Sequence, residues 1–307
     1  MNRIDGALFI VTVLIWGTTW FVILGQLGDI HPVVSVAWRF LLASLIMFGI
    51  CLARADVLSL SLADHLYCIC LGLFLFCINY CLFYIASLTV TTGLISMIFS
   101  TMVFWNSFGA WLFLGDPLDG RALIGGVLGL AGLSLLFYGE LQTFSLVNAN
   151  ANANANALLI CLVATLSASA GNLISARLQS RLISVWTSAA FGMLYGGILT
   201  LGFALHQDLQ LEFSWTFLYV GSLIYLVIFG SVFAFGAYLT LIGRLGPGRA
   251  AYAAVMFPVV AVGLSILFED YEPTAIAGLA VILVLLGNWL ALTTSKGMKS
   301  SCAARSG

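Results

Sequence analysis

Residues Ala7 to Leu27 read ALFIVTVLIWGTTWFVILGQL, a run of uncharged and mostly apolar side chains. The hydrocarbon core of a bilayer is about 30 Å thick, and a helix of about 20 such residues crosses it. Nine further runs of this kind follow: Val33 to Leu52, Leu66 to Ala86, Gly93 to Leu114, Ala122 to Tyr138, Ala157 to Ala176, Ile183 to Leu205, Leu218 to Leu239, Ala250 to Phe268 and Ala275 to Leu292. The sequence therefore predicts an all-α membrane protein with ten transmembrane helices.

The composition agrees with this interpretation. Of the 307 residues, 62% are hydrophobic and 7% are charged, whereas soluble proteins carry about 25% charged residues. The breaks between the runs are too short to hold a soluble domain. The net charge of −1 says little about partners. We expect a small-molecule substrate and the lipid bilayer as partners, and no nucleic acid.

The placement of the charges predicts the orientation in the membrane. If the N-terminus is cytoplasmic, alternate loops place Lys and Arg on the inside, at Arg3, Arg54, Arg121, Arg177, Arg181, Arg244, Arg249, Lys296, Lys299 and Arg305. The external loops hold no Lys or Arg but carry Asp29, Glu140, Asp208, Glu212, Glu269, Asp270 and Glu272. The positive-inside rule then places both termini in the cytoplasm of a multi-pass protein. The compact loops fit a bacterial cytoplasmic membrane.

The chain divides into two similar halves. An Asn-Ala dipeptide repeats with five runs on either side of it, so residues 148–156 are expected to form a solvated linker. At an offset of about 153 residues, Gly93 aligns with Gly246 and Phe104 with Phe257. Residues 1–147 and 157–295 are therefore predicted to be two repeats, followed by a cytoplasmic tail at 296–307. Because five is odd, the second repeat enters the bilayer from the opposite side, which gives inverted five-helix repeats.

Several short motifs point to a known family. They are Trp16-Gly17 with Trp20, Arg39-Phe40, the segment from Ala250 through Phe257-Pro258 to Glu269, and the glycine-containing runs near Gly125 and Gly278. In these features the chain resembles the EamA branch of the drug/metabolite transporter superfamily over nearly its whole length. The resemblance implies ten helices from two EamA repeats and transport of small metabolites by alternating access. One departure is Trp105, where the second repeat has Pro258 and where the family often has proline.

Arg39 is the one charged residue inside the predicted spans. It lies about two turns into the second run, roughly 10 Å deep at 1.5 Å per residue. A charge at that depth costs at least about 2.5 kcal/mol unless it is solvated or paired. Three interpretations follow: a group that contacts the substrate, a structural group that faces the protein interior, or a side chain that snorkels to the outer surface.

Polar and aromatic side chains within the runs define an expected substrate cavity. Amides and tyrosine hydroxyls need partners at membrane depth, and aromatic-lined pockets with few polar groups are the usual form of small-molecule sites. The expected cavity residues are Trp16, Thr19, Trp20, Arg39, Asn79, Tyr80, Tyr84, Ser100, Trp105, Asn172, Phe233, Tyr252 and Pro258. Pro258 is also the expected hinge, since it alone among the prolines lies near the middle of a span. A purely structural kink is the alternative.

Small residues recur at four-residue spacing, as Ser188, Gly192, Gly196 and Thr200 in the seventh run and as Gly125 and Gly129 in the fifth. Such ridges let helices approach closely. We expect them to pack within one chain, with a homodimer seam as the alternative.

The residues missing from the spans limit the function. No Asp or Glu lies inside a predicted span, and His31, His65 and His206 lie at loops or span edges. We therefore expect facilitated diffusion or exchange in place of carboxylate-based proton coupling. A membrane-embedded enzyme would need a carboxylate pair, a His-metal motif or a Ser/His dyad at depth, and the sequence offers none. No catalysis, cofactor or metal is expected.

The sequence thus favours a secondary transporter that exports small organic metabolites. The family resemblance suggests amino acids or related amphipathic compounds. A sugar-phosphate or nucleotide-sugar carrier of the same superfamily is the alternative, but it would need several cationic groups at depth, and only Arg39 is available. A membrane protein without transport activity, such as a sensor, would be expected to carry a soluble output domain, and no loop is long enough to be one.

Overall fold

The structure, a computed structural model, describes residues 2–28, 30–138, 151–268 and 275–293. These residues form helices and connecting turns, and no strand occurs among them. The helices of the first half are α1 (Arg3–Ile23), α2 (Pro32–Ala53), α3 (Leu62–Leu71), α4 (Asn79–Ala86), α5 (Thr92–Ser100), α6 (Met102–Gly109) and α7 (Gly120–Leu136). Those of the second half are α9 (Ala151–Ser180), α10 (Val185–His206), α11 (Phe217–Val227), α12 (Ala234–Leu245), α13 (Pro247–Ala250), α14 (Tyr252–Phe268) and α15 (Ala275–Leu292).

Within the described ranges, three spans contain a π-helical segment. The segment η2 (Gly72–Ile78) joins α3 to α4, η3 (Ala110–Leu114) extends α6, and η4 (Ile228–Phe233) joins α11 to α12. A short 3-10 turn, η1 (Leu24–Gln26), follows α1. A π-helical hydrogen bond spans five residues where an α-helical one spans four, and the change of pattern can leave backbone carbonyls free for other donors.

Eight helical segments within the described ranges are long and apolar enough to cross a membrane. The fifth and ninth predicted runs are also helical, but α7 and α14 are shorter, at 17 residues each. The all-α membrane class predicted from the sequence is confirmed, and the count of ten spans stays a prediction.

Part of the expected linker at residues 148–156 is helical, and the bounds of the two repeats stay a prediction. Helix α9 already begins at Ala151, six positions before the predicted run, and it continues to Ser180. Asparagine and alanine are both tolerated in a helix, and alanine is the best helix former. Propensity therefore extends the helix into a segment whose Asn-Ala alternation argued against a buried one. Residues 148–150 lie outside the described part of the chain.

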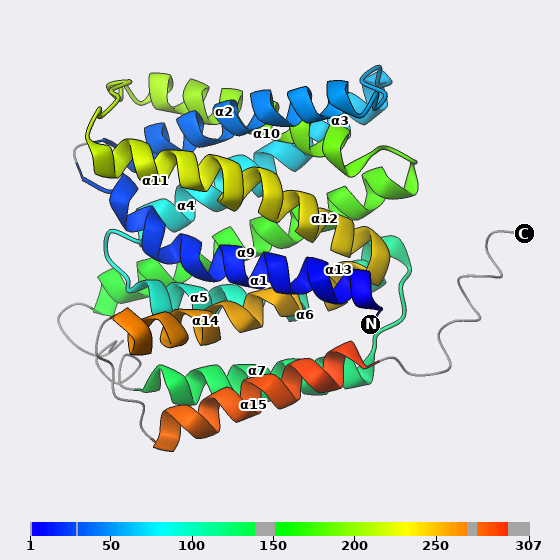
Figure 1. Cartoon of the computed structure of the whole chain (residues 1–307), viewed down its shortest axis with the longest axis vertical. Coiled ribbons are helices and arrows are strands. Elements are labelled where there is room, and N and C mark those ends of the chain that lie inside the picture. Colours follow the sequence, from blue (N-terminus) through cyan, green and yellow to red (C-terminus); the bar gives the residue numbers. More distant parts are fainter. Residues whose placement is uncertain (1, 29, 139–150, 269–274, 294–307) are drawn as a thin grey trace, which may run out of the picture.

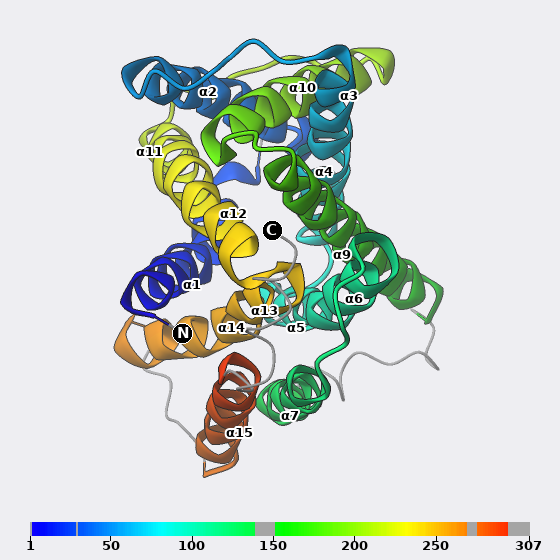
Figure 2. The same ribbon diagram turned by 90° about the vertical axis from the view of Figure 1, so that its right-hand side faces the viewer.

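The first helix of each half packs against helices of the other half. Helix α1 packs against α12 and α14 of the second half, and α9, its counterpart, packs against α4, α5, α6 and η2 of the first. Two further pairs consist of corresponding helices of the two halves: α2 lies along α10, and α7 lies along α15. Figure 2 shows these two pairs at opposite edges of the bundle, with the other helices between them. Such reciprocal packing is what inverted repeats predict.

The first described helix begins and the last one ends at the same face of the bundle, on the right in Figure 1. We call this face, where α1 begins, the N-face. Following the chain, α2, α9 and α12 end at the N-face, whereas α1 and α4 end at the opposite face. Figure 2 looks onto the N-face.

The glycine ridges pack within the chain. A Cβ atom on Gly125 would lie 2.5 Å from the carbonyl oxygen of Gly287, and a Cβ on Gly287 would lie 2.5 Å from that of Gly125. In α10, a Cβ on Gly196 would lie 2.8 Å from the carbonyl oxygen of Gly72. These side-chain-free contacts bring the α7–α15 and α10–η2 backbones together, as the sequence indicated for packing within one chain. A homodimer seam stays an untested alternative.

Candidate functional site

A cavity lies at the centre of the bundle, between the two halves. Its lining comes from α1, α2, α4, α5, α6, α9, α12, α14 and η2. The space not filled by atoms is about 620 Å³, which includes open solvent at the mouth of the cavity. The lining residues are Trp16, Thr19, Ile23, Arg39, Leu75, Asn79, Tyr80, Phe83, Tyr84, Ser87, Phe99, Met102, Ala168, Asn172, Phe235, Tyr238 and Phe257.

The cavity extends toward the face opposite the N-face. Along α1 its lining begins at Trp16, in the middle of the helix, and reaches Ile23, the last helical residue. Ser87, which follows the last residue of α4, also belongs to the lining. Residues at the N-face ends of these helices are not part of it.

Aromatic rings form the inner end of the cavity. The indole of Trp16 packs edge-on against Phe235 at 4.8 Å and Phe257 at 5.7 Å, and it is tilted against Tyr238 at 4.9 Å, all between ring centroids. Edge-to-face pairs of this kind are favourable beyond the area that they bury. Because Trp16 comes from the first half and its three ring partners from the second, the aromatic end of the cavity is a contact between the halves.

The π-helical segment η4 supplies a free carbonyl to this contact. Trp16 Nε1 donates to the carbonyl oxygen of Gly230, at 3.0 Å. In the other half, Ser167 Oγ of α9 donates to the carbonyl oxygen of Phe74 in η2, at 2.6 Å. The first helix of each half thus bonds a π-helical carbonyl of the other half. π-helical turns recur at functional sites because they expose such groups.

Arg39 enters the cavity wall from α2 with 1% of its surface exposed. Its Nε donates to Ser231 Oγ at 2.9 Å, its Nη1 to the Tyr84 hydroxyl at 3.2 Å, and its Nη2 to the Gly230 carbonyl at 3.1 Å. The guanidinium carbon also lies 4.7 Å from the centre of the Tyr80 ring. Arg39 therefore faces the protein interior and does not snorkel to the surface.

Two asparagines line the cavity. Asn79 Nδ2 donates to the carbonyl oxygen of Ala164 at 3.2 Å, and Asn172 Nδ2 donates to the Tyr238 hydroxyl at 3.0 Å. Asn172 Oδ1 is buried and finds no partner within the described residues. Thr19 lies 153 positions before Asn172, so the repeat places these two lining residues at matching positions of α1 and α9.

Seven of the residues expected from the sequence line this cavity: Trp16, Thr19, Arg39, Asn79, Tyr80, Tyr84 and Asn172. Trp20 belongs to α1, and its side chain lies outside what the structure describes. The other five expected residues lie elsewhere: three are buried between helices and two have exposed side chains.

Three of the five are buried in contacts between helices. Ser100 Oγ donates to the carbonyl of its own helix at Ser96 and lies 3.1 Å from that of Ala254, and the Tyr252 hydroxyl donates to the Ala122 carbonyl. Pro258 is buried inside α14, next to the lining residue Phe257. Backbone carbonyls thus satisfy the hydroxyls of Ser100 and Tyr252. The hinge role of Pro258 stays a prediction.

The remaining two, Trp105 and Phe233, have exposed side chains, at 37% and 50% of their surface. Phe233 ends the π-helical segment η4, and its ring lies 5.9 Å from that of Phe229, which is also exposed. The two phenylalanines share the outward face of this span, and Phe235 and Tyr238 line the cavity.

Several lining residues are ordinary apolar side chains that sequence reasoning passed over, among them Phe83, Phe99, Met102, Phe235 and Phe257. One signal was available for Phe257, because the repeat aligns it with Phe104 and it precedes the only mid-span proline. The others carry no local signal that separates cavity from core.

The N-face is held together by ion pairs. Three of the four ion pairs found among the described residues join an acid of the first half to an arginine of the second: Asp5 to Arg244 at 2.5 Å, Asp64 to Arg181 at 2.6 Å and Asp119 to Arg249 at 2.6 Å. None of these residues lines the cavity, so the cavity does not reach this face, where the two halves are joined.

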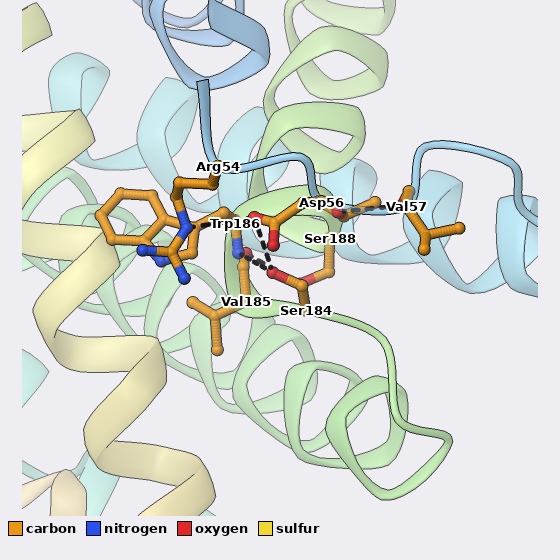
Figure 3. Close-up of polar contacts among 8 residues, drawn as sticks. Arg54, Asp56, Val57, Ser184, Val185, Trp186 and Ser188 are labelled. Atoms are coloured by element: carbon orange, nitrogen blue, oxygen red, sulfur yellow. Dashed lines mark hydrogen bonds and ion pairs between the residues drawn. The ribbon is translucent and has the colours of Figure 1, made fainter. Parts of the chain in front are cut away.

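Figure 3 shows a fourth link at the N-face, where the turn after α2 meets the start of α10. Asp56 pairs with Arg54 at 3.2 Å and accepts from Ser184 Oγ at 3.3 Å. The Arg54 guanidinium lies 5.5 Å from the centre of the Trp186 ring. These contacts tie the two halves together next to the α2–α10 pair.

The same family model matches the chain twice. It is the EamA-like transporter family, and the matched residues are 6–138 and 155–293. One match falls in each half of the chain.

Relatives of similar length are named as transporters. The "Probable amino-acid metabolite efflux pump" of Escherichia coli K12 is 25% identical, over 94% of this chain and 95% of that protein. The "Uncharacterized inner membrane transporter YedA" of the same organism is 27% identical, over 93% and 91% of the two chains. The "Uncharacterized transporter YvbV" of Bacillus subtilis is 23% identical, over 94% and 92%.

A solved crystal structure also matches, with a TM-score of 0.73 and 16% sequence identity over 95% of this chain and 97% of that one. At this identity the likeness shows the fold alone.

Proposed function

Because the chain belongs to the EamA-like transporter family, we propose that it exports small organic metabolites, amino acids or related amphipathic compounds, by alternating access. One observation carries the proposal: a central cavity ringed by aromatic side chains lies between the halves, extends toward one face, and is closed at the other by contacts between those halves. A cavity that must open to each side in turn needs such a division.

The charges at the N-face support a cytoplasmic placement of that face. Arg54, Arg181, Arg244 and Arg249 all take part in its ion pairs, and loops rich in Lys and Arg stay in the cytoplasm. The closed face is then the inner one, and the cavity faces outward. This corresponds to the state in which an exporter releases its substrate.

The name of one relative, a probable amino-acid metabolite efflux pump, supports both the substrate class and the direction. The lining supports a small amphipathic molecule, since aromatic rings surround a few amide, hydroxyl and guanidinium groups. A sugar-phosphate carrier is disfavoured, because Arg39 is the single cation among the lining residues.

Transport by the purified protein in proteoliposomes tests the proposal. Vesicles loaded with an unlabelled amino-acid mixture should accumulate a labelled amino acid by exchange, saturably and in the absence of a proton gradient. Trp16→Ala should abolish accumulation, because it removes the inner aromatic wall. Trp215→Ala is the matched control, since the Trp215 side chain is 85% exposed and lies outside the cavity.

Absence of exchange for every amino acid and related metabolite, by protein that is correctly folded, would contradict the proposed function. Orientation is a separate measurement. A fluorescent protein that matures only in the cytoplasm should fluoresce when fused to either terminus.

A further inference from the structure

The cavity contains a buried positive charge that meets only neutral groups. The partners of Arg39 are a serine hydroxyl, a tyrosine hydroxyl and a backbone carbonyl. None of the ion pairs among the described residues includes Arg39. The Tyr80 and Phe40 rings, at 4.7 and 5.4 Å from the guanidinium carbon, add a favourable field but no charge.

Such a charge is expensive unless something neutralises it. Removing a guanidinium from water costs several kcal/mol, and hydrogen bonds to neutral groups recover only part of that cost. The guanidinium has five N–H donors, and three hydrogen bonds to protein acceptors are present. Donor capacity and an uncompensated charge therefore remain in the wall of the cavity.

The surroundings hold the guanidinium in place. Ser231 Oγ, which accepts from Arg39, donates in turn to the carbonyl oxygen of Leu226 at 2.9 Å across the π-helical segment η4. A Cβ atom on Gly230 would lie 3.0 Å from Arg39 Nη2, so glycine leaves the space that the guanidinium occupies. The N–H donors that remain on Nη1 and Nη2 are held in a fixed place, and a carboxylate oxygen is a charge-assisted acceptor for such donors.

We propose that Arg39 is the anion-binding group of the cavity and that the transported metabolite carries one carboxylate. This inference rests on the proposed function and names its substrate class more closely. The number of charges follows from the lining, in which Arg39 is the single cation. A phosphate monoester carries about two negative charges near neutral pH and would remain half neutralised.

The internal repeat places this group in one half only. At the offset of 153 residues, Thr19 corresponds to Asn172, but Arg39 corresponds to Gly192. The cavity is therefore electrostatically one-sided: the charged end of a substrate lies against α2, and its remainder lies against the rings of Trp16, Phe235 and Phe257. The substrate binds in one orientation although the two halves are alike.

Pairs of acids and amides test this inference with the purified protein. The probes are L-phenylalanine, L-leucine, L-threonine and 3-phenylpropanoate, each beside its primary amide, and the readouts are thermal stabilisation and inhibition of exchange. The wild-type protein should bind one or more of the acids and bind the matching amide at least about 30-fold more weakly, the ratio that about 2 kcal/mol represents. 3-Phenylpropanoate separates the carboxylate from the ammonium group.

Variants then assign the effect to one side chain. Arg39→Gln should remove the preference for acid over amide, and Arg39→Lys should retain part of it, because an ammonium keeps the charge but lacks the donor arrangement of a guanidinium. Arg121→Gln is the control, since Arg121 is exposed at the start of α7 and outside the cavity. If Arg39→Gln does not fold, the comparison of each acid with its amide on the wild-type protein still tests the inference.

Equal affinity for an acid and its amide would overturn the inference, and so would the absence of binding by all four acids or an unchanged preference in Arg39→Gln. These results differ from failure of the proposed function. A protein that exchanges amides or other uncharged metabolites is still a transporter without an anion site.

Discussion

Arg244 Nε in α12 donates to the carboxylate of Asp5 in α1, at 2.5 Å, and so joins the second half of the chain to the first. The pairs Asp64–Arg181 and Asp119–Arg249 repeat this arrangement at the same face. Ion pairs that are partly or fully exposed to solvent are individually weak. Three of them can hold the N-face closed and still release it when the halves move.

We therefore expect the triple variant Asp5→Asn, Asp64→Asn, Asp119→Asn to open the N-face more often. Hydrogen–deuterium exchange should rise in residues 103–109 and 244–250, which meet at this face through the hydrogen bond from Asn106 Nδ2 to the Pro247 carbonyl. Asp208→Asn, in a turn at the opposite face, is the control. Unchanged exchange in both segments would show that the ion pairs do not hold the closure.

Asp119 should make stability depend on pH. Burial raises the pKa of its carboxyl, but the hydrogen bond and charge of Arg249 outweigh burial, and the net pKa lies below the ordinary value of 3.8. A carboxyl with a lowered pKa in the folded state contributes stability above its unfolded pKa and loses it as pH falls through the folded value. In detergent, the Tm of the wild-type protein should fall below pH 3.8 more steeply than that of Asp119→Asn. Parallel curves would remove Asp119 from the acid-sensitive groups.

The contact between α7 and α15 should tolerate no side chain at Gly287. A Cβ there would lie 2.5 Å from the Gly125 carbonyl oxygen and 2.8 Å from the Gly129 nitrogen, both backbone atoms that cannot move aside alone. We expect Gly287→Ala to destabilise the protein by about 1–3 kcal/mol, as overpacking does. Gly278→Ala, on the same helix with nothing within 4 Å of the added Cβ, should leave the Tm unchanged or raise it slightly. Equal Tm values for the two variants would argue against this close contact.

Trp16→Phe should separate the contribution of the aromatic ring to transport from that of the indole hydrogen bond. Phenylalanine keeps an aromatic ring near Phe235 and Phe257 but loses the donor to the Gly230 carbonyl, which still accepts from Arg39. A hydrogen bond of this kind contributes about 0.5–1.5 kcal/mol net, so exchange should fall by no more than about tenfold. Trp16→Ala should abolish it. If both variants lost all activity, the indole N–H would have a larger role than its hydrogen bond accounts for.

Much of this molecule follows from the sequence because the bilayer acts on the chain locally. Each apolar run becomes a helix whose length the hydrocarbon thickness demands, and a buried guanidinium such as that of Arg39 must find partners wherever the chain places it. The repeat offset likewise relates Thr19 to Asn172, and both line one cavity. The fold class, the repeat and most of the polar lining residues could therefore be predicted from the sequence.

Tertiary structure alone decided which faces of the helices meet. In the span that contains η4, Phe235 and Tyr238 line the cavity, whereas Phe229 and Phe233 share the outward face, and their spacing alone does not tell the two sets apart. The π-helical segment also presents the carbonyl of Gly230 to Trp16 and Arg39. A helical rotation depends on packing between distant segments, and one sequence does not contain that information in any local pattern.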